Sequence, residues 1–285
     1  MRRIENWEEF ENSVEFFVDS ANVYHCHFLL LPELFTAQLI YTMHHEGQYD
    51  QALRRVTEYY DSYLEMFRRF SEQYQLYIIA GTTPTPRNGE IYNAAHLFTP
   101  SGHYYTQDKL HLTPGERIDW GIHPGEQLRV FATPFGRIAI LVCYDIEFPE
   151  LARLLALQGV EAIFVPFSTD ERKAFNRIRI TSHARAVENY LYVITAGNVG
   201  NLPTIKNYLL NYAQAAIYTP SDFAFPLNAI AGEADPNVET VVVADLDLNT
   251  LAAQRESGSV RPFFDRRPDL YDLTGGQDIE IVTVE

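Results

Sequence analysis

The sequence predicts an α/β fold, and three observations support this class. Short apolar runs of strand length alternate with longer amphipathic segments along the chain. The 285 residues, 46% hydrophobic and 21% charged, can build a large core, since a chain of this size buries about three quarters of its unfolded surface. There is no low-complexity linker and no repeat of about 20 to 50 residues. We therefore interpret residues 1–285 as a single domain.

Periodicity and turn residues predict the elements of the first half of the chain. Asn6 and Glu9 resemble a capping box in front of apolar residues at helical spacing, and PTPRNGE is a typical turn between two strands. The predicted elements are a helix at 7–22, a strand at 27–32, a helix at 51–75, a strand at 76–83 and a hairpin of 91–100 with 102–110.

The second half continues the alternation. Phe135 and Gly136 mark a turn between two strands of 129–143, and Pro149 and Gly159 delimit a helix at 148–159. The remaining predictions are strands at 162–167, 191–200, 214–220 and 239–247, a helix at 171–190, and a last helix capped near Asn249.

The charge and the cysteine count limit the partners. A formal charge of −16 disfavours nucleic acid and anionic membranes, because phosphate binding needs a positive surface. Two cysteines cannot form a disulfide framework, which indicates a reducing compartment. The start resembles no signal peptide, and no run approaches 18 apolar residues. We therefore expect a cytoplasmic protein without a nucleic-acid or membrane partner.

Two segments resemble metal sites but are better explained otherwise. His25 and His27 have no second ligand pair at zinc spacing. Residues 245–256 carry acidic residues at calcium-loop offsets but lack the glycine at the sixth position. The sequence predicts neither a metal nor a cofactor.

Three predicted strands end in a reactive side chain. Glu33 follows FLLLP, Lys109 lies in YYTQDKLHL, and Cys143 ends IAILVC. Ligands gather at the carboxyl ends of strands in α/β sheets, so these side chains could meet in one pocket. Each also has an ordinary explanation: cysteines fill cores, lysines are usually exposed, and Glu33, like Glu150, could lie in the first turn of a helix.

Four motifs taken together carry a family resemblance. FLLLPELF, DKLHL followed by Glu116, CYDIEFPE and ARAVENYLYV resemble, in order and separation, the nitrilase superfamily of carbon–nitrogen hydrolases over roughly residues 7–255. The resemblance implies a four-layer α-β-β-α sandwich, commonly assembled into a homodimer or higher homo-oligomer. It also implies Glu33 as general base, Lys109 as cationic partner and Cys143 as nucleophile.

Two further residues take roles from the same resemblance. Glu116 matches a second glutamate that positions substrate, and the backbone N–H of Tyr144 would join Lys109 in holding the oxyanion. The chemistry is coherent, because a thiol with a pKa near 8.5 needs a base about 3 Å away to attack an amide and form a thioester. A positioned donor at the oxyanion contributes roughly 3–4 kcal/mol to lowering the barrier.

The residues after Cys143 bear on the substrate. Cys-Tyr-Asp resembles amidase-type members, so we expect hydrolysis of a small linear amide to a carboxylic acid and ammonia, without a cofactor. Hydrolysis of an N-carbamoyl compound by the same triad is the first alternative. A non-catalytic binding or assembly module that retains the fold is the second.

Arginines of the segment 171–190 give a further hypothesis. Arg172 or Arg177 could bind a substrate carboxylate at the mouth of the pocket. The alternative is a helix face with ion pairs, such as Arg185 with Glu188.

The chain departs from the resemblance at its start. Family members open with an apolar strand, whereas this sequence begins Met-Arg-Arg and enters the helix directly. Either that first β-strand is missing and a sheet edge lies open, or the natural product is longer. We favour the second, because an unpaired buried edge is a liability. Some relatives carry an acetyltransferase-like domain ahead of this one, which makes such a domain a candidate N-terminal partner.

Overall fold

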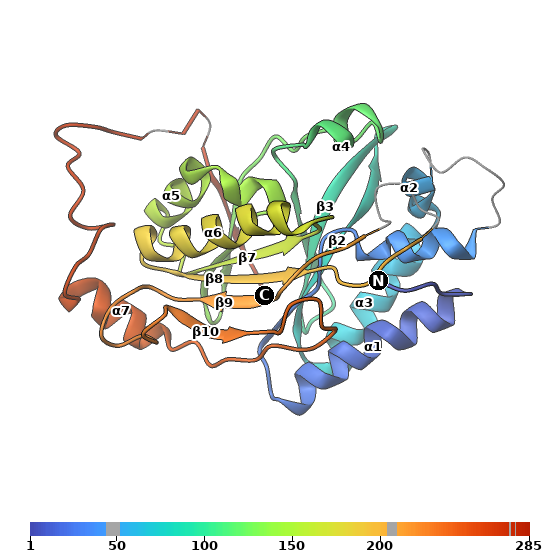
Figure 1. The fold of residues 1–285 in the computed structure, drawn as a ribbon, viewed down its shortest axis with the longest axis horizontal. Coiled ribbons are helices and arrows are strands. Elements are labelled where there is room, and N and C mark those ends of the chain that lie inside the picture. The colour runs from blue at the N-terminus through green and yellow to red at the C-terminus, as the bar shows by residue number, and fades with distance from the viewer. Residues whose placement is uncertain (44–51, 204–209, 274, 277) are drawn as a thin grey trace.

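The strands of the computed structural model form two sheets (Figure 1). The structure describes residues 1–43, 52–203, 210–273, 275–276 and 278–285, and all statements concern these ranges. In the described chain the smaller sheet has the order β1-β2-β3-β4, with β1 parallel to β2 and the rest antiparallel. Its strands are β1 (Phe28–Leu30), β2 (Tyr77–Arg87), β3 (Glu90–Phe98) and β4 (Tyr104–Asp108).

The larger sheet has a parallel centre and antiparallel neighbours. Within the described ranges its order is β10-β9-β8-β7-β6-β5-β11, in which β6, β7 and β8 run parallel and β11 pairs parallel with β5. Its strands are β5 (Arg129–Thr133), β6 (Gly136–Ile140), β7 (Ala162–Phe167), β8 (Tyr192–Gly197), β9 (Ala216–Tyr218), β10 (Ile230–Glu233) and β11 (Glu280–Thr283).

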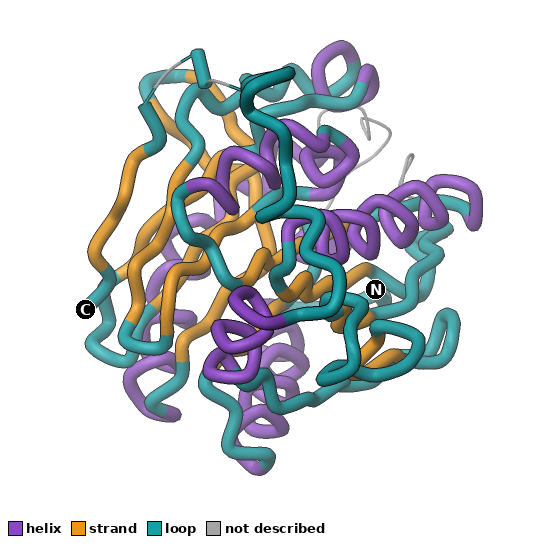
Figure 2. The backbone as a smooth tube through the Cα atoms, turned by 90° about the vertical axis from the view of Figure 1, so that its left-hand side faces the viewer, coloured by secondary structure: helices purple, strands orange, loops and turns teal. Residues whose placement is uncertain are grey.

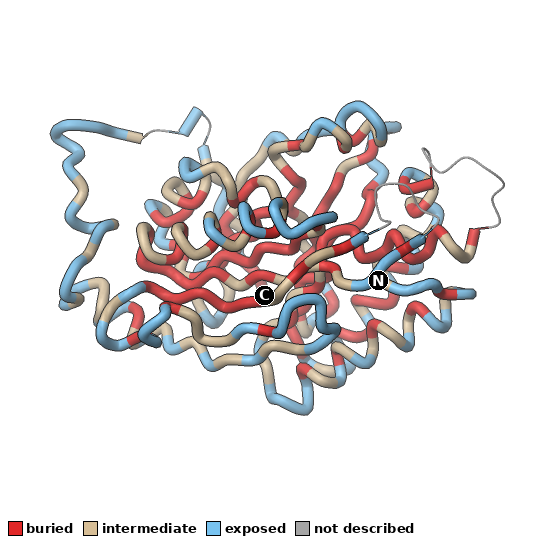
Figure 3. The backbone as a smooth tube through the Cα atoms, viewed as in Figure 1, coloured by how far each residue is buried: buried red, intermediate tan, exposed pale blue. Residues whose placement is uncertain are grey.

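Helices cover the outer faces of both sheets. Helices α1 (Trp7–Val23) and α3 (Tyr60–Tyr74) pack on the smaller sheet, and α5 (Pro149–Leu157) and α6 (Arg172–Asn189) lie on the larger one (Figures 1 and 2). Ile79 and Leu97 of the smaller sheet share one buried cluster with Val130 and Ile138 of the larger, so the two sheets face each other. Figure 3 shows mostly buried residues along the sheets and a mixture of buried, intermediate and exposed residues along the outer helices. The predicted four-layer α-β-β-α sandwich is confirmed.

The prediction of one continuous helix at 51–75 is wrong. Residue 51 lies outside the described residues, and the rest divides into α2 (Ala52–Arg55), a 3₁₀ turn η3 (Val56–Tyr59) and α3. The hydroxyl of Thr57 donates to the carbonyl of Arg54 at 2.7 Å. Such side-chain bonds to backbone carbonyls can compete with the helical ladder.

The strand predicted at 239–247 is also wrong, because these residues have no regular secondary structure. No ladder joins them to another described strand, so their β-favouring sequence lacks a partner. Helix α7 (Leu248–Ser257) follows its N-cap Asp247, whose Oδ1 accepts from the Asn249 N–H at 2.8 Å, so the cap predicted near Asn249 lies two residues earlier. The other predicted strands and helices are present, some with shorter ends.

Elements that the periodicity did not reveal are short. They are the 3₁₀ helices η1 (Phe35–Thr42) and η4 (Cys143–Glu147), helix α4 (Pro114–Ile118), and the strands β10 and β11. The first described element is α1, with no strand in residues 1–6. No helix in the described ranges is long and apolar enough to cross a membrane.

Candidate active site

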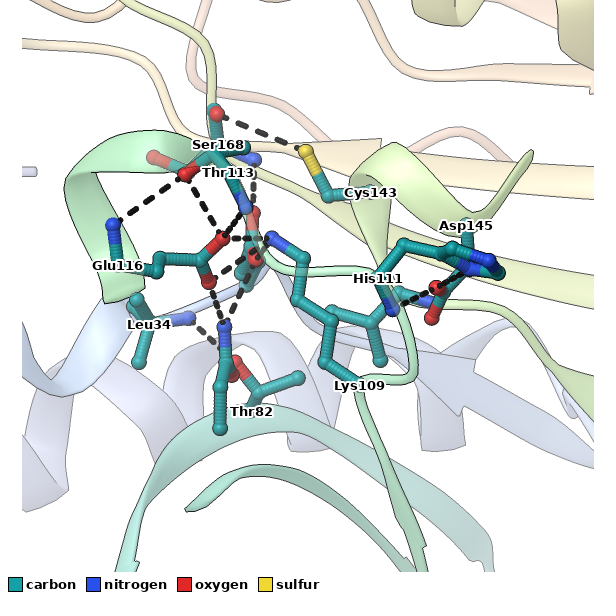
Figure 4. A network of polar contacts seen from close by, with 12 residues as sticks. Leu34, Thr82, Lys109, His111, Thr113, Glu116, Cys143, Asp145 and Ser168 are labelled. Atoms are coloured by element: carbon teal, nitrogen blue, oxygen red, sulfur yellow. Dashed lines mark hydrogen bonds and ion pairs between the residues drawn. The ribbon is translucent and has the colours of Figure 1, made fainter. Parts of the chain in front are cut away.

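The structure brings Glu33, Lys109 and Cys143 together from the ends of three strands. Glu33 follows β1, Lys109 follows β4 and Cys143 lies just beyond β6. Figure 4 shows the side chains of Lys109 and Cys143 in this cluster. The three residues are buried, with exposed fractions of 3%, 2% and 6%. Lys109 Nζ lies 2.8 Å from Glu33 Oε1. The Cys143 thiol donates to the Ser168 carbonyl oxygen at 3.8 Å. The Glu33 carboxylate lies close enough for its charge to help raise the pKa of the thiol.

Cys143 has a strained backbone that a local hydrogen-bond network holds. Its φ is +49°, in the left-handed region, where a residue other than glycine costs about 1–3 kcal/mol. Asp145 Oδ2 accepts from the Val142 N–H at 3.2 Å. On the far side, Arg185 of α6 donates to the carbonyls of Ile146 and Glu147, both at 3.1 Å. The turn that carries the sulfur is therefore held at both ends.

Asp145 also joins this turn to the segment after Lys109. Its carboxylate accepts from the backbone N–H groups of Leu110 at 3.2 Å and His111 at 2.8 Å. Nδ1 of the His111 ring lies 2.9 Å from the same carboxylate (Figure 4). The ring also stacks on Phe148. One buried carboxylate thus fixes the sulfur and the ammonium relative to each other.

Glu33 is held through its backbone and its side chain. The Ser168 N–H donates to Glu33 Oε2 at 2.9 Å, and the Asn198 amide donates to the Glu33 carbonyl at 2.6 Å. Gly81 permits the turn to approach β2, because a Cβ there would lie 1.9 Å from the Pro32 oxygen. The residue at 81 also has φ +54°, which favours glycine.

A second carboxylate shares the ammonium. Glu116 lies in α4 and accepts from Lys109 Nζ at 2.7 and 2.9 Å. The helix begins with a capping box in which Thr113 and Glu116 bond reciprocally, so the cap itself aims the carboxylate. The Asn93 amide of β3 donates to both Glu33 Oε1 at 2.9 Å and Glu116 Oε1 at 2.8 Å. Lys109 and Asn93 together hold two buried carboxylates side by side.

The surroundings raise the pKa of the Glu33 carboxyl group and lower that of the Glu116 carboxyl group. Burial raises the pKa of Glu33 above its usual value, although Lys109 opposes the shift. Burial would also raise the pKa of Glu116, but the Lys109 ammonium and the hydrogen bonds from its neighbours bring the pKa below its usual value. Burial would lower the pKa of Lys109, and the two carboxylates raise it well above its usual value. Glu116 is therefore the permanent counter-ion and Glu33 the group able to exchange a proton.

The thiol is not ionised at rest. Burial, and next the Glu33 carboxylate, raise the pKa of Cys143 well above that of a free cysteine. The sulfur therefore needs to lose its proton during attack, to an acceptor already beside it. Glu33 has that position.

Sequence reasoning missed the supporting residues around these groups. Ser168 and Asn198 directly follow β7 and β8, so the strand-end argument that found Glu33 could have found them. Asn93 lies inside β3, and nothing in IYNAAHLF distinguishes it from a solvated strand residue. Asp145 was noted for the substrate class and not for its structural contacts.

The other predicted site residues lie further out. Tyr144 follows Cys143 in η4, and its ring contacts Phe148 edge-on at 4.9 Å between centroids. Arg177 pairs with Glu147 at 3.3 Å, its side chain 57% exposed. Arg172 is exposed at the first residue of α6. The structure does not bring these two arginines into the buried cluster.

Several arginines of α6 form ion pairs, which is the alternative interpretation of this segment. Arg185 pairs with Glu188 at 3.0 Å, as the ion-pair interpretation predicted, and Arg179 pairs with Glu233. Cys26 is half-buried beside a cavity next to β1.

Comparisons with known proteins agree with this geometry. The profile of the family described as Carbon-nitrogen hydrolase matches residues 3–256. A Bacillus subtilis protein named Probable hydrolase YhcX is 46% identical over 273 residues, 96% of this chain and 53% of that protein, so the chain spans about half the length of this relative. Omega-amidase NIT2 of Xenopus tropicalis is 29% identical over 73% of this chain and 74% of that protein.

A solved structure supports the fold. It is a variant of an amidase from Nesterenkonia sp. AN1 that shows the Michael addition of acrylamide at the active site cysteine. It has a TM-score of 0.70 and 21% identity and covers 95% of this chain and 94% of that chain. The motifs, the sandwich and the family match agree: the chain belongs to the carbon–nitrogen hydrolase family.

Proposed function

We propose that this protein is a cysteine-dependent amidase that hydrolyses a small linear amide to a carboxylic acid and ammonia. One observation carries the proposal: a buried thiol lies beside a carboxylate with a raised pKa, and both lie beside a buried ammonium. Pairs of carboxyl groups driven apart in pKa typically mark acid–base sites.

In the first half-reaction Glu33 accepts the proton of the Cys143 thiol while the sulfur attacks the amide carbonyl carbon. The oxyanion is stabilised by the Lys109 ammonium and the backbone N–H of Tyr144. Glu33 then gives the proton to the nitrogen of the tetrahedral intermediate. The C–N bond breaks, ammonia leaves, and the acyl group remains as a thioester on Cys143.

In the second half-reaction water replaces ammonia. Glu33 removes a proton from the water as its oxygen attacks the thioester carbonyl, and the C–S bond breaks. The carboxylic acid leaves, and the proton returns to the thiolate. Glu116 stays ionised throughout, so the Lys109 ammonium remains charged while Glu33 changes its protonation state.

The relatives support this reaction class. Two of the proteins similar to this chain are named an omega-amidase and an amidase with an active site cysteine. The chain covers 53% of its Bacillus relative, so the proposal concerns the reaction of this part alone.

The proposal can be tested by measuring the ammonia that the protein releases from ω-amides, aliphatic amides and N-carbamoyl amino acids. We expect turnover of linear amides and a thioester adduct on Cys143 detected by mass spectrometry. Cys26→Ala is the matched control and should retain activity. Turnover restricted to carbamoyl compounds, with amine and carbon dioxide as co-products, would favour the first alternative. If no compound is turned over or protects Cys143 from iodoacetamide, the second alternative holds.

A further inference from the structure

His111 lies two residues after Lys109, and the proposed reaction uses no atom of its side chain. Nδ1 of its ring lies 2.9 Å from Asp145 Oδ1, and the ring stacks on Phe148 with 3.7 Å between the ring centroids. Figure 4 shows His111 and Asp145 pointing toward one another. The His111 side chain is 36% exposed, whereas that of Asp145 is 1% exposed. A partly exposed histidine therefore contacts a buried carboxylate two residues after Cys143.

Among the described residues, His111 makes two of the four hydrogen bonds that the Asp145 carboxylate accepts. Oδ1 accepts from the His111 backbone N–H at 2.8 Å and from Nδ1 of the ring. Oδ2 accepts from the N–H groups of Leu110 and Val142, both at 3.2 Å. A carboxylate has about four lone-pair positions and no hydrogen, so Nδ1 carries the hydrogen of this contact. Removing the ring would leave a buried acceptor position without a donor.

The ring of His111 meets the turn that carries the sulfur at two points. Asp145 lies in the middle of η4, and Phe148 follows its last residue. The Phe148 N–H donates to the Asp145 carbonyl at 3.2 Å, and the Phe148 ring contacts the Tyr144 ring edge-on. Tyr144 carries the N–H proposed as an oxyanion donor. His111 therefore contacts residues on which the position of this donor depends.

The backbone of His111 follows closely on the second oxyanion donor, Lys109. The Lys109 N–H donates to the Asn93 carbonyl at 2.9 Å, and the Lys109 carbonyl accepts from the Gly125 N–H at 2.8 Å. These bonds fix Lys109 to β3 and to the stretch before β5, and neither of them reaches η4. The bonds of His111 to Asp145 do reach η4. His111 therefore links the segments that carry the two donors.

We propose that His111 is a positioning residue of the oxyanion site. By bonding to Asp145, its imidazole sets where the Tyr144 N–H lies relative to the Lys109 ammonium. The inference rests on the proposed amidase reaction, in which both donors bind the same oxyanion. Such donors have to lie about 2.7–3.1 Å from that oxygen, and a displacement of about 1 Å can cost roughly 100-fold in rate. The charge develops only in the transition state, so misplaced donors should lower kcat and leave KM nearly unchanged.

Two substitutions separate the hydrogen bond from the ring stack. His111→Phe keeps an aromatic ring for Phe148 and has no donor for Asp145, whereas His111→Asn keeps a donor near the position of Nδ1 and loses the stack. We expect kcat for a linear amide to fall about 30-fold in His111→Phe and at most about fivefold in His111→Asn. KM should stay within about threefold in both. His103→Phe, an exposed histidine at the other end of β4, is the matched control and should keep the wild-type kcat.

Two reagents for the Cys143 thiol show which part of the site has changed. With butyraldehyde the sulfur bonds to the carbonyl carbon, the thiol proton passes to Glu33, and the carbonyl oxygen takes the charge and the place of the oxyanion. Methyl methanethiosulfonate instead forms a methyl disulfide and releases methanesulfinate, with no oxyanion on carbon. His111→Phe should weaken inhibition by butyraldehyde by about the same factor as kcat. The rate of disulfide formation, followed by mass spectrometry, should stay within about twofold.

Three results would overturn the inference and leave the proposed reaction standing. The first is wild-type kcat in His111→Phe. The second is a rise in KM alone, which would mean contact with the substrate. The third is an equal loss of reactivity toward both reagents, which would mean a general disturbance of the site.

Two further outcomes are also decisive. If thermal unfolding shows that His111→Phe does not fold, His111→Asn decides, and a loss well beyond fivefold would overturn the inference. If the wild type turns over no amide, the proposed function fails, and the weakening of butyraldehyde binding alone decides the inference. A wild type that does not bind butyraldehyde either would have no oxyanion site for His111 to position.

Discussion

The two sides of the β1 region are built in opposite ways. At its carboxyl end, the charged atoms of Glu33, Lys109 and Glu116 bind one another or nearby backbone within the chain. Along its free edge, the backbone of Phe28 and Leu30 faces an apolar groove. The reactive groups are thus held by contacts within the chain, whereas β1 is paired on one side only among the strands that the structure describes.

The difference follows from the energies involved. A buried charge without a partner costs several kcal/mol, so the catalytic cluster exists only where its partners are already in place. An open strand edge beside an apolar groove leaves a few backbone groups unpaired, a smaller cost that a folded chain can tolerate. Changes in the cluster should therefore alter the reaction, and changes in the groove should alter stability and exchange.

The largest expected effect comes from the sulfur. Cys143→Ala should lower kcat by roughly 10⁴-fold or more, because the nucleophile is gone. Cys26→Ala, which alters the groove wall, should leave kcat within about twofold. Both should be measured by ammonia release. Substantial activity in Cys143→Ala would refute the thioester route.

Removing the shared ammonium should affect both stability and activity. Lys109→Met leaves the Glu33 and Glu116 carboxylates facing each other, which should cost about 3–5 kcal/mol in the free energy of unfolding at pH 7. Without the ammonium the folded pKa of both carboxyl groups rises, so the loss should shrink as the pH falls and they take up protons. Urea unfolding at several pH values measures this. The double variant Lys109→Met/Glu116→Gln should recover part of the loss, and equal stability of the single variant and wild type would contradict the shared-charge arrangement.

The pH profile distinguishes the two carboxylates. Activity needs ionised Glu33, so kcat/KM should fall as the pH drops through its raised pKa, above the ordinary value of 4.5. The negative charge of Glu116 contributes to raising this pKa, so Glu116→Gln should move the acidic limb to lower pH. The test is the profile of both proteins on one amide. A limb that stays in place would show that Glu116 does not act on Glu33.

Asn93 should have a moderate effect. Asn93→Leu removes a neutral donor from both carboxylates, a loss of about 1–1.5 kcal/mol that corresponds to roughly tenfold in rate. We expect the change in kcat and not in KM, since Asn93 acts through the two glutamates. A rise in KM alone would indicate direct contact with substrate.

The smallest effect concerns the outer arginines. Arg177→Ala breaks an exposed pair with Glu147, which is worth at most about 1 kcal/mol. Arg172→Ala removes an exposed side chain at the start of α6. If either arginine reads a substrate carboxylate, KM should rise for acidic amides only. Equal changes for neutral and acidic amides would exclude that role.

Features set by neighbouring residues could be predicted from the sequence. The polarity change after a buried strand singled out Glu33, Lys109 and Cys143 as candidates, and only the family resemblance gave them roles. Periodicity located the helices on both faces. The strand at 239–247 was predicted wrongly because a strand needs a partner, which its own sequence cannot reveal. Asn93 was missed for a similar reason: its value lies in contacts with residues 60 and 23 positions away.

The contacts of Asp145 have a consequence for engineering. Because this carboxylate accepts from Val142, Leu110 and His111, hydrogen bonds join the sulfur-bearing turn to the stretch after Lys109. If a loop from a relative with another substrate range replaced only one of the two stretches, it would lose its hydrogen-bond partners in the other stretch. Grafts should exchange 110–113 and 142–145 together, or leave both untouched and vary the exposed side of α4, where Ile118 is 78% exposed.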